Sequence, residues 1–245
     1  MKKPQRLRWL FPVSTLIAVI EMSACALVEA LPFGGDTWQE EVLLHDGSTI
    51  VVERTVKRGG RHEVGQKPSF KEQRLSFTVP GSTQTITWED HLSQDLGQAN
   101  FLPMALDIVG GTPYLVVYPM GCLSYNKWGR PNPPYVVFQY REKEWKRIPL
   151  QELPTEITRP NVLFSQPDVE IERFGKRMIT ADMIKDVIAG YQQPEFKTLL
   201  REPMKAGSEG TTVNCEEMVH YKCGWFGTSP DGKFNKEFAD RMCNK

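Results

Sequence analysis

Hydrophobic and polar residues alternate along short runs in the middle of the chain, as in β-strands with one buried face. Leu75, Phe77 and Val79 share one face of such a run, and Ile86 and Trp88 share one face of the next. Turn residues join the runs in pairs. The runs therefore predict four successive β-hairpins, over residues 38–56, 73–88, 102–118 and 135–148.

The hairpins predict a mainly β fold class, arranged as an antiparallel sandwich or as a wound antiparallel sheet. A β-propeller is the less favoured interpretation, because its blades need about 40–45 residues each and no repeat of that length is present. Near the C-terminus, Thr180 precedes an apolar stripe at helical spacing, which predicts a helix ending at Gly190. A second short helix is predicted over residues 233–242, where apolar side chains recur every four residues.

The first 24 residues have the order of an export signal. Basic residues come first, the apolar run Trp9–Ile20 follows, and small residues with a cysteine come last. At ~1.5 Å per residue this run makes about 18 Å of helix, less than the ~30 Å of a hydrocarbon core. We therefore expect residues 1–24 to be a signal peptide and residues 25–36 to be a tether.

Two routes of processing compete at the end of this signal. The triplet that ends at Cys25 is similar to a bacterial lipobox, with Met22 where Leu is usual, and predicts lipidation of Cys25. Ordinary cleavage after Ala26, or at a weaker site at Ala30, would instead give a periplasmic or secreted protein. An uncleaved anchor is the third alternative. Lipid on Cys25 would hold the protein at the membrane of the bacterial cell envelope.

The remaining cysteines fit an exported protein with disulfide bonds. They are Cys122, Cys215, Cys223 and Cys243. An even number in an oxidising compartment predicts two bridges, of which at least one is local to the C-terminus, because three of the cysteines lie there. A zinc site is the alternative, but the spacing of Cys215 and Cys223 does not fit the usual knuckle. We expect no metal and no cofactor.

Charge and length limit the partners and the domains. The chain has 30 basic and 30 acidic residues, and the part after residue 24 has 26 and 29. Such a balance gives no support to nucleic-acid binding, which needs clustered basic residues. Residues 37–205 are expected to form a β-rich globular domain. A polar linker places a boundary near residue 206, and residues 206–245 form a cysteine-containing segment too short for a core of its own.

Motifs for catalysis are absent. The sequence has no nucleophile elbow and no glycine-rich phosphate loop. His62 and Glu63 begin a metalloprotease-like pattern, but Gln66 stands where the second histidine is needed. These two residues are more simply read as structural or solvated.

Two carboxylates stand beside a histidine at Glu89, Asp90 and His91. Neighbouring residues of an extended chain point to opposite sides, so adjacency alone does not build a site. His45 precedes a hairpin turn and is expected to be solvated. An envelope hydrolase that takes its acids and bases from Glu89, Asp90, His91 and the His62-Glu63 pair is the alternative function.

Residues 119–134 are long for a hairpin connection and rich in side chains that anchor binding surfaces. Tyr125, Trp128 and Arg130 are the candidate binding residues. The alternative is that Trp128 packs on the sheet while Cys122 fixes the segment to it.

Four segments carry a resemblance to a known family. They are WQEEVLLHDG at 38–47, GGRHEVGQ at 59–66, GCLSYNKWGRP at 121–131 and EWKRIPL at 144–150. Together they resemble a family of uncharacterised bacterial lipoproteins over roughly residues 36–203. The resemblance implies a lipid anchor and brings no catalytic residue with it.

The sequence therefore predicts an exported bacterial envelope lipoprotein that acts as a non-catalytic interaction or structural module. Its partners would be the membrane, through the lipid, and an envelope protein or glycan, with no nucleic acid.

Overall fold

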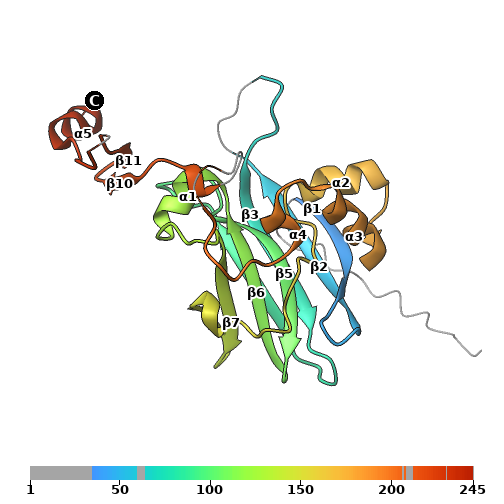
Figure 1. Cartoon of the computed structure of the whole chain (residues 1–245). Coiled ribbons are helices and arrows are strands. Elements are labelled where there is room, and N and C mark those ends of the chain that lie inside the picture. The colour runs from blue at the N-terminus through green and yellow to red at the C-terminus, as the bar shows by residue number, and fades with distance from the viewer. Residues whose placement is uncertain (1–34, 60–63, 206, 208–211, 230, 245) are drawn as a thin grey trace, which may run out of the picture. The chain divides into compact units, whose positions relative to one another are not determined.

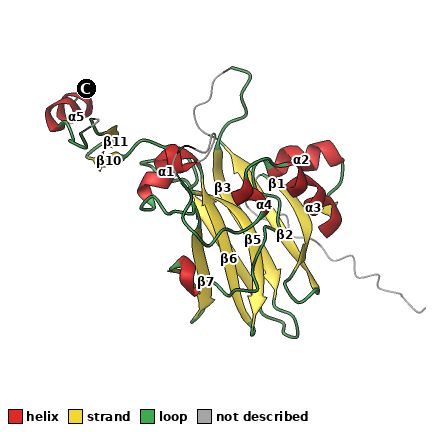
Figure 2. Ribbon diagram, in the orientation of Figure 1, coloured by secondary structure: helices red, strands yellow, loops and turns green. Residues whose placement is uncertain are grey.

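The computed structural model describes residues 35–59, 64–205, 207, 212–229 and 231–244. Of these residues, 37% lie in strands and 22% in helices, which confirms the mainly β fold class (Figures 1 and 2). The predicted signal peptide, Cys25, the His62-Glu63 pair and the boundary at residue 206 lie outside the described residues.

One sheet has five strands in the order β4-β3-β2-β1-β9. Their bounds are β1 Asp36–Leu43, β2 Thr49–Arg58, β3 Phe70–Thr78, β4 Thr85–His91 and β9 Met178–Ile179. All neighbours are antiparallel except β1 and β9. The β1-β2 turn is closed by a hydrogen bond from the Leu44 amide to the Ser48 carbonyl, and Gly47 takes a φ of +85° there. Glycine suits this left-handed conformation because it has no Cβ.

The second sheet has four strands in sequence order, all antiparallel. They are β5 Phe101–Val109, β6 Thr112–Pro119, β7 Val136–Arg141 and β8 Glu144–Ile148. The pairs β1-β2, β3-β4, β5-β6 and β7-β8 confirm the four predicted hairpins.

The two sheets share a hydrophobic core. Leu75 of the first sheet and Leu106 and Leu115 of the second belong to one cluster and are fully buried. Burying each such side chain contributes about 1.5–3 kcal/mol. Phe77, Ile86 and Trp88 of the predicted strand faces are also buried in this cluster. The alternation read from the sequence is thus the alternation between core and surface.

Short helices complete the described fold. They are α1 Gly121–Lys127, α2 Pro167–Phe174, α3 Ala181–Gly190, α4 Pro194–Lys197 and α5 Lys236–Cys243, with 3₁₀ turns at Leu150–Glu152 and Thr212–Asn214. The predicted helix after Thr180 is confirmed as α3, and the threonine hydroxyl accepts a hydrogen bond from the Met183 amide. The second predicted helix is confirmed as α5, which begins later because Asn235 is its N-cap. Helices α2 and α3 lie beside β1 (Figure 1).

Two disulfide bonds connect the C-terminal part of the chain. Cys122 pairs with Cys215, and Cys223 pairs with Cys243. The second bridge joins Cys223, in the turn between β10 Met218–Tyr221 and β11 Gly224–Gly227, to Cys243 at the end of α5. The predicted disulfides are therefore confirmed, and they place the protein in an oxidising, extracytoplasmic compartment. None of the helices in the described residues is long and apolar enough to cross a membrane.

Candidate functional site

The segment predicted to bind a partner instead holds the C-terminal part of its own chain. Arg130 donates hydrogen bonds to the carbonyls of Cys215 and Glu216, at 2.7 and 2.9 Å. Asn126 donates to the Glu216 carbonyl at 2.9 Å and accepts from the Met218 amide at 2.8 Å. These bonds lie beside the Cys122–Cys215 bridge. They give hydrogen-bond partners to main-chain carbonyl and amide groups of the segment that leads into β10.

Tyr125 and Arg130 do not form the predicted free binding surface. The segment begins as helix α1 rather than as a loop, and this turns Tyr125 inward, where its ring is 2% exposed. Burial raises the pKa of the Tyr125 hydroxyl. The Arg130 guanidinium lies over this ring, 5.1 Å from its centre, while it also binds the C-terminal main chain. Sequence alone does not reveal this, because the residues that cover Arg130 lie more than 80 positions away.

Trp128, the third predicted binding residue, lines a groove on the protein surface. Its ring packs 4.6 Å from that of Phe101 and its indole N–H donates to Asn100 at 3.2 Å. Trp88, Phe138 and Trp145 bring three more rings to the same hollow, which has a volume of about 270 Å³. We call this the aromatic groove. Its remaining lining residues are Glu89, Asp90, His91, Asn100 and Phe101.

The aromatic groove forms where the edges of the two sheets meet. The Trp145 indole N–H on β8 donates to the Thr87 carbonyl on β4 at 2.8 Å, so this ring bridges the two edge strands. Trp128 and Trp145 are partly exposed, whereas Trp88 is 4% exposed and contributes to the floor.

The structure places the predicted acid–base residues on both faces of β4. Glu89 and His91 lie on the outer face, with Glu89 paired to Arg74 at 2.9 Å and to His91 at 3.4 Å. Asp90 lies on the inner face and accepts hydrogen bonds from the amides of Asn100 and Phe101 at 2.7 and 2.8 Å. Burial raises the pKa of Asp90, and these hydrogen bonds oppose the rise. The three side chains therefore do not converge on one point.

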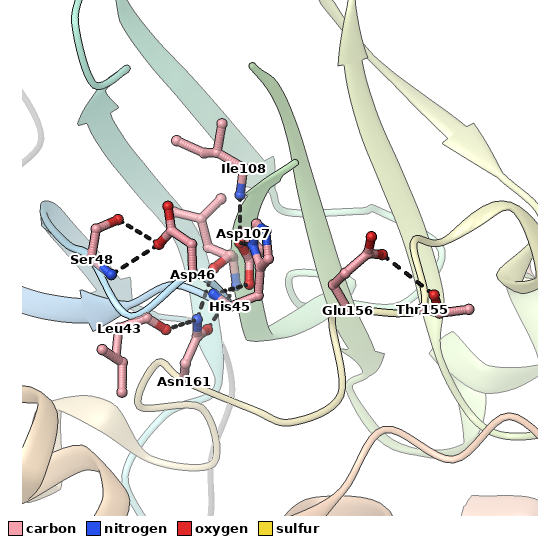
Figure 3. A network of polar contacts seen from close by, with 10 residues as sticks. Leu43, His45, Asp46, Ser48, Asp107, Ile108, Thr155, Glu156 and Asn161 are labelled. Carbon is pink, nitrogen blue, oxygen red and sulfur yellow. Dashed lines mark hydrogen bonds and ion pairs between the residues drawn. The ribbon is translucent and has the colours of Figure 1, made fainter. Parts of the chain in front are cut away.

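His45 is exposed, as predicted from its position beside a turn, and it also contacts Asp107. Its Nδ1 lies 2.7 Å from an oxygen of Asp107 on β5, and its amide donates to the other oxygen at 3.0 Å (Figure 3). The hydrogen bond to Asp107 raises the pKa of His45, and burial opposes the rise. The signal that could have revealed this contact is an acidic residue within the apolar strand 101–109.

Asn161 connects the same turn to β5. Its amide nitrogen donates to the carbonyls of Leu43 and Leu106 at 2.9 and 2.8 Å, and its oxygen accepts from the Leu106 amide at 2.9 Å (Figure 3). The side chain therefore joins the end of β1 to the middle of β5. A serine, threonine or cysteine that His45 could activate is not among its contacts in the described residues, so the geometry is that of a structural network.

The described residues include no group of three or more histidine, cysteine or acidic side chains able to hold a metal ion. Comparison of the chain with protein-family models, curated proteins and solved structures gives no match.

Proposed function

We propose that this chain is an exported protein of the bacterial envelope that acts as a non-catalytic interaction module. In this proposal residues 1–24 direct export and lipid on Cys25 holds the protein at the membrane. Two disulfide bonds support export, because such bonds persist in oxidising compartments. The similarity of the triplet that ends at Cys25 to a lipobox is the basis for the proposed anchor.

The aromatic groove is the observation that carries the interaction role. It presents the rings of Trp128 and Trp145 beside the polar side chains of Glu89 and His91. Rings with flat apolar faces and a polar rim are suited to stack on sugars and to bind their hydroxyl groups. We therefore propose an envelope glycan as the partner, in preference to a protein.

The envelope hydrolase is the less supported alternative. Asp90 is occupied by main-chain hydrogen bonds, and Glu89 is paired with Arg74 and His91. General acid–base catalysis needs two such groups aimed at one reacting bond. His62 and Glu63, its other candidates, lie outside the described residues.

Binding to purified peptidoglycan sacculi, and to a soluble N-acetylglucosamine tetrasaccharide, tests the proposed function. Trp145→Ala and Trp128→Ala are expected to weaken binding by at least about tenfold, as loss of a stacked anchor does. Trp225→Ala is the matched control, because Trp225 lies on β11 and does not line the groove.

Thermal unfolding of each variant must accompany the binding measurement. Trp128 packs on Phe101 and Phe138, so its replacement is also expected to lower the melting temperature. A lower melting temperature with unchanged glycan binding would assign Trp128 to packing alone. Binding of a protein partner, with no glycan binding by the wild type, would contradict the proposed glycan, and release of soluble sugar would favour the hydrolase.

A further inference from the structure

A second groove lies along α3 and is chemically unlike the aromatic groove. Its volume is about 440 Å³. Its lining residues are Leu43, Arg159, Pro160, Asn161, Ala181, Asp182, Ile184, Lys185, Ile188, Ala189 and Lys197. We call it the α3 groove. Pockets of roughly 300–1,000 Å³ are the usual size for small-molecule sites.

The sequence of α3 explains the aliphatic residues in the lining of the groove, of which Ile184 and Ile188 also belong to the core and are 1% and 9% exposed. Ala181, Ile184 and Ile188 recur at helical spacing and therefore share one face. The first helical amide, of Ala181, donates to Glu41 on β1 at 3.4 Å, which holds the helix beside the strand. Leu43, at the end of that strand, is 36% exposed and borders the groove. The floor is thus built on regular elements rather than on loops.

Asn161 fixes the opposite wall. Figure 3 shows its side chain bonded to the Leu43 carbonyl, and it also bonds to the main chain of Leu106. Arg159 and Pro160 precede it directly. The wall therefore has a defined position relative to the helix, as a preformed binding site requires.

Three cationic side chains without ion-pair partners among the described residues line this groove. Arg159, Lys185 and Lys197 are exposed, and within the described part of the chain their side chains make no ion pair or hydrogen bond. Asp182 is the acidic lining residue. The groove thus carries an excess of positive charge, although the whole chain has a formal net charge of zero. This excess complements an anionic ligand.

We propose that the α3 groove binds a free long-chain carboxylate of the fatty-acid type. The aliphatic floor would contact the hydrocarbon chain, and the three cations would surround the carboxylate. None of the described residues that line the groove is aromatic, which distinguishes it from a site for a nucleobase or a sugar ring. This inference is independent of the glycan proposal, because the two grooves share no lining residue.

Calorimetric titration of the folded protein with hexadecanoate tests the inference, and hexadecanol is the uncharged probe. We expect one molecule of hexadecanoate to bind, and the alcohol to bind at least about tenfold more weakly, since a charged hydrogen bond is lost. K185A/K197A is expected to weaken hexadecanoate binding by at least about tenfold for the same reason. A189F should also weaken it, by filling the groove from an exposed position of α3.

The matched control is R141A/K236A, which removes two exposed cations that do not line the groove. It should bind hexadecanoate as the wild type does. Equal binding by all variants, equal binding of the alcohol, or binding only to anionic phospholipid vesicles would overturn the inference. Because A189F and K185A/K197A alter exposed side chains, thermal unfolding should confirm that both remain folded. Loss of glycan binding in the tryptophan variants would leave this result unaffected.

Discussion

Glu195 is the least satisfied charged residue among those described. It lies in α4 with none of its surface exposed, and neither carboxylate oxygen has a hydrogen-bond partner. The neighbouring Tyr135 hydroxyl donates to the main-chain carbonyl of Glu195 at 2.8 Å rather than to its carboxylate. Burial raises the pKa of the Glu195 carboxyl. The protein therefore favours the neutral form of this side chain.

The raised pKa of Glu195 predicts a pH-dependent stability. The stabilisation of the folded state that follows from this raised pKa is fully present below the ordinary carboxyl pKa of 4.5. It is lost as the pH rises through the pKa of Glu195 in the folded state. Glu195→Gln keeps the shape but removes the ionisation. We expect this variant to resemble the wild type near about pH 4 and to be more stable than it at about pH 8. Urea unfolding across this range measures the difference, and parallel curves for the two proteins would contradict it.

At the scale of elements, Arg54 and Glu40 join β2 and β1 to the chain that precedes α2. Both side chains are buried, with Nη1 of Arg54 3.0 Å from an oxygen of Glu40. Arg54 also donates to the Leu163 carbonyl at 2.6 Å, and Glu40 accepts from the Leu163 amide at 3.0 Å and the Trp38 indole at 2.7 Å. Burial lowers the pKa of Arg54, which the neighbouring carboxylate opposes.

Arg54→Met is expected to lower the free energy of unfolding by about 3–5 kcal/mol, because it leaves the Glu40 charge buried without its partner. E40Q/R54M should recover part of this loss, since it removes the buried charge and the single amide oxygen can still accept one of the two hydrogen bonds that Trp38 and Leu163 donate to the two carboxylate oxygens. Chemical denaturation of the wild type, both single variants and the double variant gives the interaction free energy between Glu40 and Arg54. Additive losses would show that the two charges do not stabilise each other.

The elements that the sequence revealed are those whose pattern is local. Alternation predicted the hairpins because each strand has one face in the core, and Thr180 marked α3 because a cap is a local hydrogen bond. Helix α1 has seven residues and no side-chain cap, and so short a helix is not stable alone. Its tertiary contacts and the Cys122 bridge stabilise it, and no local pattern shows those contacts.

The candidate sites were less predictable because they depend on tertiary contacts, which leave no local pattern in the sequence. The aromatic groove joins Trp88, Trp128 and Trp145, which lie in three separate segments. Only Trp128 was predicted to contribute to a binding surface, and the companions predicted for it face the protein interior or the C-terminal chain. Strand order brings the three rings together, because the edge strands β4 and β8 meet at Trp145.

At the scale of the whole molecule, the Cys122–Cys215 bridge connects the β-rich body to the C-terminal part of the chain. Among the described residues, neither core cluster includes a side chain beyond Leu200. The body can therefore keep its core without the C-terminal residues. The bridge spans 93 positions, and closing a loop of that size stabilises a fold by up to about 4–5 kcal/mol in the chain-entropy model.

C122S/C215S is expected to stay folded but to unfold at a lower temperature, and to release the C-terminal part on limited proteolysis. Mass spectrometry of the fragments identifies the cleavage sites, and circular dichroism follows the β signal. C223S/C243S is the control, because its bridge lies within the C-terminal part itself. Release of the same fragment from the control and the test variant at equal rates would contradict this role of the first bridge.

Export to the envelope is the claim on which the functional account depends, and intact mass measures it most directly. The protein is recovered from membrane and soluble fractions, and its mass is taken before and after reduction with alkylation. We predict a membrane-bound chain that begins at Cys25, carries added acyl mass, and gains four alkyl groups only after reduction. A chain that retains residues 1–24 and is alkylated at all its cysteines without reduction would contradict the account.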